Sequence, residues 1–142
     1  MRILLDTNVI LDYILSRPVG GEAAKKIFKL ILDDEFTGGM TANTVTDIFY
    51  IIKKSLDDKK AREVLLYLLK ALFVIEVDGN DCLDALKTDI SDFEDALVIM
   101  CAKKDTVDYI VTNDADFQKI NLPDIKNIKI ISPEDLLKLC EK

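Results

Sequence analysis

A short apolar run near the N-terminus leads into a polar turn, Ile3-Leu4-Leu5-Asp6-Thr7-Asn8, and residues 9–16 then carry a helical pattern. The apolar run predicts a buried strand, and the polar residues predict the turn from that strand into a helix. A strand followed at once by a helix is typical of α/β proteins with a parallel sheet.

The same alternation continues along the chain. Strands are predicted at residues 40–42, after the break at Gly38-Gly39, and at 73–77, 108–111 and 128–131; helices are predicted at 22–33, 44–55, 58–71, 81–86 and 92–104. Ser132-Pro133-Glu134-Asp135 predicts the start of a last helix, because Ser caps, Pro suits the first helical position and acids complement the helix dipole. Residues 96–102 are apolar on every side, so their helix is expected to lie deep in the protein, beside a parallel sheet covered on both faces.

Length and composition bound the functions that remain. The 142 residues suit one domain, expected to span residues 1–142. The chain has no histidine, which excludes Ser-His-Asp triads, Cys-His dyads and His-based zinc sites. Its 26 acidic against 19 basic residues, a formal charge of −7, argue against nonspecific coating of nucleic acid. Any catalysis is therefore expected to use carboxylates and hard metal ions.

Cysteine usage and hydropathy bear on the compartment. The cysteines Cys82, Cys101 and Cys140 are odd in number and not closely paired, which favours free thiols in a reducing environment. The sequence shows no signal-peptide pattern and no apolar stretch approaching the ~20 residues of a membrane span. We therefore expect a cytoplasmic protein without membrane association.

Four aspartates follow predicted strands. Asp6 comes directly after the first strand, and Asp114 follows the fourth after Thr112 and Asn113, while Asp47 and Asp95 are placed in the first turns of helices. Ligands of open α/β sheets bind at the carboxyl ends of the strands, where these side chains would gather.

Each aspartate also has a purely structural interpretation. Asp6 could cap a helix and Asp114 could form an Asx turn, while residues 44–47 and 91–94 resemble capping boxes. Capping does not require acids at several junctions, however, and Ser91 is predicted to cap the buried helix without help from Asp95. Together the four acids favour a functional site.

Several carboxylates in one cleft raise one another's pKa and oppose folding unless cations neutralise them. Oxygen-only ligands select Mg²⁺ or Mn²⁺ over zinc. Such an ion lowers the pKa of its bound water, and a second ion about 3.5–4 Å away stabilises the leaving oxygen, so the cluster suits phosphodiester hydrolysis without a histidine base.

Several segments match a known family. Leu4-Leu5-Asp6-Thr7-Asn8-Val9-Ile10-Leu11-Asp12 resembles the opening motif of PIN-domain proteins. Residues 41–48 (TANTVTDI), 92–97 (DFEDAL) and 110–117 (IVTNDADF) resemble the three later motifs in the same order, and residues 132–135 resemble the start of the last helix. The similarity covers about residues 2–137.

The resemblance implies a three-layer α/β/α sandwich with a central parallel sheet of four or five strands, and an endoribonuclease dependent on Mg²⁺ or Mn²⁺. By position, Asp6 and Asp95 are the principal metal ligands, Asp114 completes the site, and Asp47 binds a second ion or orients water. Asn8 and Thr112 match supporting polar positions, and Asp92 could support Asp95. Many small prokaryotic members are toxins of toxin–antitoxin pairs, so an antitoxin partner and a homodimer are also implied.

Alternatives remain open at this point. Asp47 stands where many members have Glu, and Asp116 competes with Asp114 as the fourth acid. Asp78 also follows a strand, but the family's strand arrangement places that strand at the sheet edge. A noncatalytic PIN-like module that binds RNA or protein is the stronger rival function. A phosphatase of the haloacid dehalogenase type is weaker, because it expects a second Asp where Asn8 stands.

Overall fold

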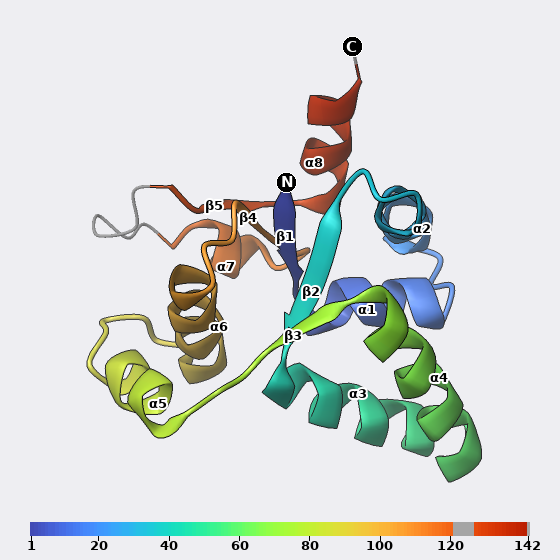
Figure 1. Ribbon diagram of the computed structural model, residues 1–142, viewed down its shortest axis with the longest axis horizontal. Coiled ribbons are helices and arrows are strands. Elements are labelled where there is room, and N and C mark those ends of the chain that lie inside the picture. The colour runs from blue at the N-terminus through green and yellow to red at the C-terminus, as the bar shows by residue number, and fades with distance from the viewer. Residues whose placement is uncertain (121–126, 142) are drawn as a thin grey trace.

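The computed structural model describes residues 1–120 and 127–141. Within these residues, five strands form one parallel sheet in the order β3-β2-β1-β4-β5 (Figure 1). The predicted α/β class and the number of strands are confirmed. The strands are β1 (Arg2–Leu5), β2 (Thr37–Thr41), β3 (Phe73–Ile75), β4 (Tyr109–Val111) and β5 (Lys129–Ile131).

Helices cover both faces of this sheet and make the three layers (Figure 1). One face carries α1, α2, α3, α4 and α8, and the other carries α5, α6 and α7. The helices are α1 (Thr7–Ile14), α2 (Gly21–Leu32), α3 (Ala42–Ser55), α4 (Asp58–Ala71), α5 (Gly79–Leu86), α6 (Phe93–Lys104), α7 (Ala115–Gln118) and α8 (Pro133–Cys140).

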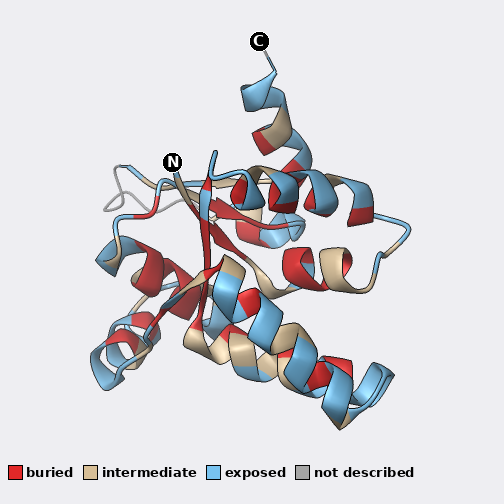
Figure 2. Ribbon diagram, turned by 45° about the vertical axis from the view of Figure 1, so that its right-hand side comes forward, coloured by how far each residue is buried: buried red, intermediate tan, exposed pale blue. Residues whose placement is uncertain are grey.

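Strand β1 occupies the centre of the sheet, in agreement with its run of consecutive apolar residues. Ile3 and Leu5 pack into the core on one face, and Leu4 packs into the core on the other. Alternate side chains of a strand point to opposite faces, so a continuous apolar run fits only a strand covered on both sides. Burial is concentrated along the strands and on the helix faces turned toward them (Figure 2).

The buried helix predicted at residues 92–104 is α6. Six of its residues are buried: Ala96, Leu97, Val98, Ile99, Cys101 and Ala102. Helix α8 begins as its sequence predicts, with Ser132 Oγ accepting a 3.1 Å hydrogen bond from the Asp135 amide and Pro133 in the first turn. Among the described residues, no helix is both long enough and apolar enough to cross a membrane.

The two glycines predicted to break the chain before β2 instead lie within it. Gly38 and Gly39 are buried strand residues. A Cβ at Gly38 would lie 2.5 Å from Cδ1 of Ile31, and a Cβ at Gly39 would lie 2.3 Å from the ring of Phe73. Glycine at these two positions therefore leaves room for the side chains of Ile31 and Phe73 rather than forming a turn, which the sequence pattern alone did not distinguish.

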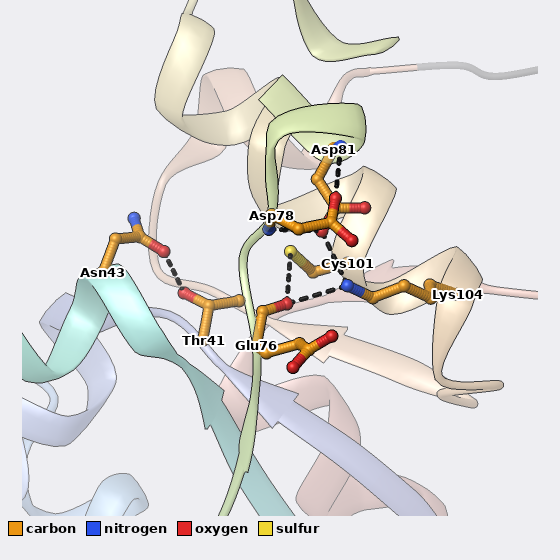
Figure 3. A network of polar contacts seen from close by, with 7 residues as sticks. All are labelled: Thr41, Asn43, Glu76, Asp78, Asp81, Cys101 and Lys104. Carbon is orange, nitrogen blue, oxygen red and sulfur yellow. Dashed lines mark hydrogen bonds and ion pairs between the residues drawn. The ribbon is translucent and has the colours of Figure 1, made fainter. Parts of the chain in front are cut away.

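A polar network joins the end of β3 to α5 and α6 (Figure 3). Lys104 Nζ donates a 2.8 Å hydrogen bond to the Glu76 carbonyl and a 2.6 Å hydrogen bond to Asp81 Oδ2. Asp78 and Asp81 form a reciprocal capping box at the start of α5. Asp78 therefore has a structural role on the edge strand's connection, in agreement with its exclusion from the candidate site.

Candidate active site at the carboxyl end of the sheet

Asp6 and Thr112 lie next to each other where the two central strands end. Leu5 of β1 pairs with Val111 of β4, and the Asp6 amide donates a 2.9 Å hydrogen bond to the Val111 carbonyl. Chain connections diverge from these two strands toward opposite edges of the sheet, so the residues that follow them flank the crevice where ligands of such sheets bind.

Thr112 fixes the orientation of the Asp6 carboxylate. Its fully buried hydroxyl donates a 2.8 Å hydrogen bond to Asp6 Oδ2, while Asp6 Oδ1 accepts a 2.9 Å hydrogen bond from the Thr7 amide. Asp6 is thus also the N-cap of α1. The structural and the functional interpretations of this residue are compatible, because capping uses one carboxylate oxygen.

A pocket of about 480 Å³ opens beside Asp6. Its walls hold all four predicted aspartates together with Asn8 and Asp92, whereas Asp116 does not line it. The lining residues are Asp6, Thr7, Asn8, Asp47, Tyr50, Ile51, Asp92, Glu94, Asp95 and Asp114.

The first turn of α6 differs from the prediction. Asp92, not Ser91, is the N-cap, and Asp92 Oδ1 accepts a 3.0 Å hydrogen bond from the Asp95 amide. Residues 91–94 therefore do not form the predicted capping box. The cap is an acid one position later, and its side chain brings a further carboxylate to the pocket.

Asp47 lies one turn further along its helix than predicted. Helix α3 begins at Ala42, with Thr41 as its N-cap, so Asp47 is the sixth helical residue and gains little from the helix dipole. Thr44 does not begin a capping box. Its hydroxyl instead lies 3.1 Å from Thr41 Oγ1 and 3.3 Å from Thr7 Oγ1, which ties α3 to the start of α1.

Asp114 combines a turn with a place in the pocket wall. Its Oδ1 accepts hydrogen bonds from the amides of Asp116, at 2.9 Å, and Phe117, at 3.4 Å, which starts α7 as an Asx turn. The Asp114 amide in turn donates a 3.1 Å hydrogen bond to Thr112 Oγ1. Asp116 is exposed and takes part in this turn only through its backbone amide.

The pocket is strongly acidic. Its lining holds six carboxylates and no Lys or Arg among the residues that the structure describes. Burial is the main cause that raises the pKa of Asp95 to about 7, with repulsion from Asp92, Asp6 and Asp114 adding to it. Burial also raises the pKa of Asp6, outweighing the hydrogen bonds from Thr112 and Thr7 that lower it.

Glu94 is an acid of the pocket that was not predicted. Its pKa is raised to about 7 by burial and by hydrogen bonding and repulsion from Asp47. Tyr50 and Ile51 also line the pocket without having been predicted. They stand three and four residues after Asp47, and this helical spacing places side chains on one face of the helix. The sequence could therefore have indicated that both residues lie beside Asp47.

The donor chemistry of the pocket fits a hard divalent cation. Its carboxylates offer only oxygen. Burial is the main cause of the raised pKa values of Asp6, Glu94 and Asp95, and repulsion between the carboxylates adds to it; a bound cation relieves that repulsion. As the side chains lie, no three Asp, Glu, Cys or His residues within 1–120 and 127–141 form a group that could hold a metal ion. Ligation by three of these carboxylates therefore requires side-chain rotation toward the ion.

Comparison with known proteins identifies the family. A family profile described as "PIN domain" matches residues 2–116, most of the chain. The chain is 25% identical over 130 residues to "Ribonuclease VapC1" of Aquifex aeolicus, an alignment that covers 88% of each protein. This protein belongs to the PIN-domain family.

Solved structures agree on the fold. A DNA-bound VapBC structure from Salmonella typhimurium superimposes with a TM-score of 0.68 at 19% identity, covering 94% of this chain and 98% of that one. VapC20 of Mycobacterium tuberculosis, described as a sarcin-ricin loop cleaving toxin, superimposes with a TM-score of 0.68 at 15% identity, covering 87% and 98%. These likenesses confirm the three-layer α/β/α arrangement.

Proposed function

We propose that this protein is an endoribonuclease that hydrolyses RNA phosphodiester bonds with Mg²⁺ or Mn²⁺ held by carboxylates. The observation that carries the proposal is the gathering of Asp6, Asp47, Asp95 and Asp114 on the wall of one pocket, at the carboxyl end of the sheet of a PIN-domain protein. The described residues that line the pocket include no histidine or cysteine to serve as an alternative base or nucleophile.

Each acid has a proposed role. Asp6 and Asp95 are the principal ligands, Asp114 completes the metal site, and Asp47 holds a second ion or orients the attacking water. When bound, the ion supplies stabilisation of the phosphate oxygens and makes its water more acidic. Thr112 holds the Asp6 carboxylate in place, and Asp92 holds the first turn of α6, from which Asp95 reaches the pocket.

The biological setting is proposed from the relatives. VapC1 is named a ribonuclease, and the Salmonella structure contains VapBC bound to DNA. We propose that this chain is likewise the toxin of a toxin–antitoxin pair, acting in the cytoplasm on RNA, with an antitoxin as its protein partner and a homodimer as its assembly.

The test is cleavage of mixed RNAs by the purified protein in Mn²⁺ or Mg²⁺, compared with excess chelator. Cleavage is expected only with the ion, and Asp6→Asn is expected to abolish it. A chemically similar control is Asp116→Asn, because Asp116 lies outside the pocket and should leave the rate unchanged. Ion-independent cleavage, or equal rates for wild type and Asp6→Asn, would contradict the proposal.

The noncatalytic alternative predicts a different outcome of the same experiment. A protein that binds RNA without cutting it would retain labelled RNA in a binding assay but give no cleavage with either ion. Hydrolysis of a phosphate monoester in place of RNA would favour a phosphatase.

A further inference from the structure

A second pocket of about 480 Å³ opens beside the acidic one. The two pockets share Asn8 and Asp114, so they are neighbours at the carboxyl end of the sheet. We propose that Arg17, held in the second pocket by Asp12, binds a phosphate of the RNA strand adjacent to the phosphate that is cleaved at the acids. This inference rests on the proposed function and adds a substrate-binding residue to it.

Asp12 is an anchor inside the protein. It is a buried residue of α1, only 5% exposed, and both of its oxygens have partners. Asn113 Nδ2 donates a 2.7 Å hydrogen bond to Oδ2, and Arg17 Nη1 lies 3.3 Å from Oδ1. Because a buried carboxylate without partners is costly, this arrangement fixes the guanidinium close to the loop that carries Asp114.

The segment after Arg17 is closely packed against the same carboxylate. Gly20 has a φ of 90°, and a Cβ at this position would lie 2.4 Å from Asp12 Oδ2. Such a backbone conformation and such a close approach are available to glycine alone. The turn between α1 and α2 is thus built around Asp12, and Arg17 is not a free surface side chain.

The positive charge of Arg17 is available to a ligand as well as to Asp12. Among the residues that the structure describes, Arg17 is the one cationic side chain on the walls of either pocket. Its contact with Asp12 involves one of the three guanidinium nitrogens, and its side chain remains 37% exposed. The remaining N–H donors of a guanidinium in this geometry suit a phosphate oxygen.

Acids elsewhere in the second pocket restrict where the phosphate lies. Asp12 is already paired, and Asp114 is a proposed metal ligand. Glu134, exposed in the first turn of α8, is the remaining acid of the lining. The phosphate is therefore expected on the Arg17 side of the pocket, away from Glu134.

The experiment measures RNA cleavage by Arg17→Met over a range of salt concentrations. KM is expected to rise about tenfold with little change in kcat, because the lost contact is made equally to bound substrate and transition state. The slope of log(kcat/KM) against log salt is expected to fall in magnitude by about 0.7, the value for one phosphate contact on a single strand. Arg17→Lys keeps the charge and should show an intermediate KM.

The matched control is Arg62→Met. Arg62 also pairs with an aspartate, Asp58, at 2.7 Å, but lies on α4 outside both pockets. The two variants change net charge equally, so an effect of overall charge would appear in both. The double variant Asp12→Asn/Arg17→Met leaves no unpaired buried charge and should match Arg17→Met in KM, because Asp12 acts through Arg17.

A modified substrate locates the contact. Once the cleavage site is mapped, one phosphate at a time beside it is replaced by an uncharged methylphosphonate. One position is expected to raise KM for wild type and to have no further effect on Arg17→Met.

Each outcome separates the inference from the proposed function. A KM within twofold of wild type together with an unchanged salt slope, for both Arg17→Met and the double variant, would overturn the inference while leaving the nuclease intact. A wild-type protein that cleaves no RNA overturns the proposed function itself.

Discussion

Thr112 Oγ1 donates a 2.8 Å hydrogen bond to Asp6 Oδ2 across two neighbouring strands, between residues 106 positions apart in the sequence. The same hydroxyl accepts a 3.1 Å hydrogen bond from the Asp114 amide. One buried side chain therefore sets the positions of two acids of the pocket at once. It does so without contacting the solvent, since Thr112 is fully buried.

Thr112→Val is expected to lower activity through the metal site. Valine has nearly the same shape but cannot donate to Asp6 or accept from the Asp114 amide, and loss of such a supporting contact typically costs about 10–100-fold in metal affinity or activity. The check is the rate of RNA cleavage as a function of Mn²⁺ concentration. Thr37→Val, at the opposite end of the sheet, should behave as wild type, and an unchanged Mn²⁺ dependence of Thr112→Val would contradict the prediction.

Asp114→Asn and Asp116→Asn are expected to differ in activity. Asp114 lines the pocket and Asp116 does not. Asparagine at position 114 keeps a side-chain oxygen for the turn that starts α7, so the loss of charge is separated from a loss of structure. Cleavage rates should fall at least tenfold for Asp114→Asn, with melting temperature little changed, and should be unaffected by Asp116→Asn. The reverse result would make Asp116 the fourth acid.

The metal-free protein is expected to lose stability as pH rises toward neutrality. Glu94 and Asp95 have pKa values of about 7, above their ordinary values of 4.5 and 3.8. Between these pH values the folded state holds protons that the unfolded state has lost. The contribution of the two groups to the free energy of unfolding is therefore complete below about pH 4 and disappears as pH rises through about 7.

Thermal unfolding with chelator at several pH values checks whether the stability of the metal-free protein falls as pH rises. Asp95→Asn should show a shallower decline than wild type, and Asp116→Asn the same decline. Mn²⁺ added near pH 7.5 should raise the melting temperature of wild type, because it binds the folded state preferentially. A melting temperature of the metal-free protein that increases between about pH 5 and pH 7 would contradict the assignment.

Lys104→Met is expected to destabilise the junction of β3, α5 and α6. Lys104 lies 2.6 Å from a carboxylate oxygen of Asp81, whose side chain is 8% exposed, so the variant leaves a nearly buried acid without its cation. Because Lys104 itself is partly exposed, we expect a loss of about 1–2 kcal/mol in the free energy of unfolding. Urea unfolding measures it, with exposed Lys103→Met as the control; equal stabilities of the two variants would exclude this role for the ion pair.

Much of the fold follows from sequence patterns because those patterns reflect burial. The apolar runs at residues 3–5 and 96–102 require coverage on all sides, and the structure places them in the central strand and the buried helix. The pattern was less informative for Gly38 and Gly39, since a glycine in a turn and a glycine beneath an aromatic ring look alike until Phe73 is placed.

Some features of the candidate site likewise follow from the sequence, and others follow only from the packing of the chain. The amino-acid sequence alone gives the available residue types, a histidine-free set of acids, and it predicts that these acids follow strands whose ends share one edge. Which acids share the pocket depends on how the chain packs in three dimensions. The pocket includes Asp114 and Glu94 but not Asp116, and the cap of α6 is Asp92 rather than Ser91. This packing also joins Asp12 to Asn113, 101 positions away. The order of the strands and the rotation of each helix about its axis decide which side chains meet. Both depend on packing between segments that are remote in the chain.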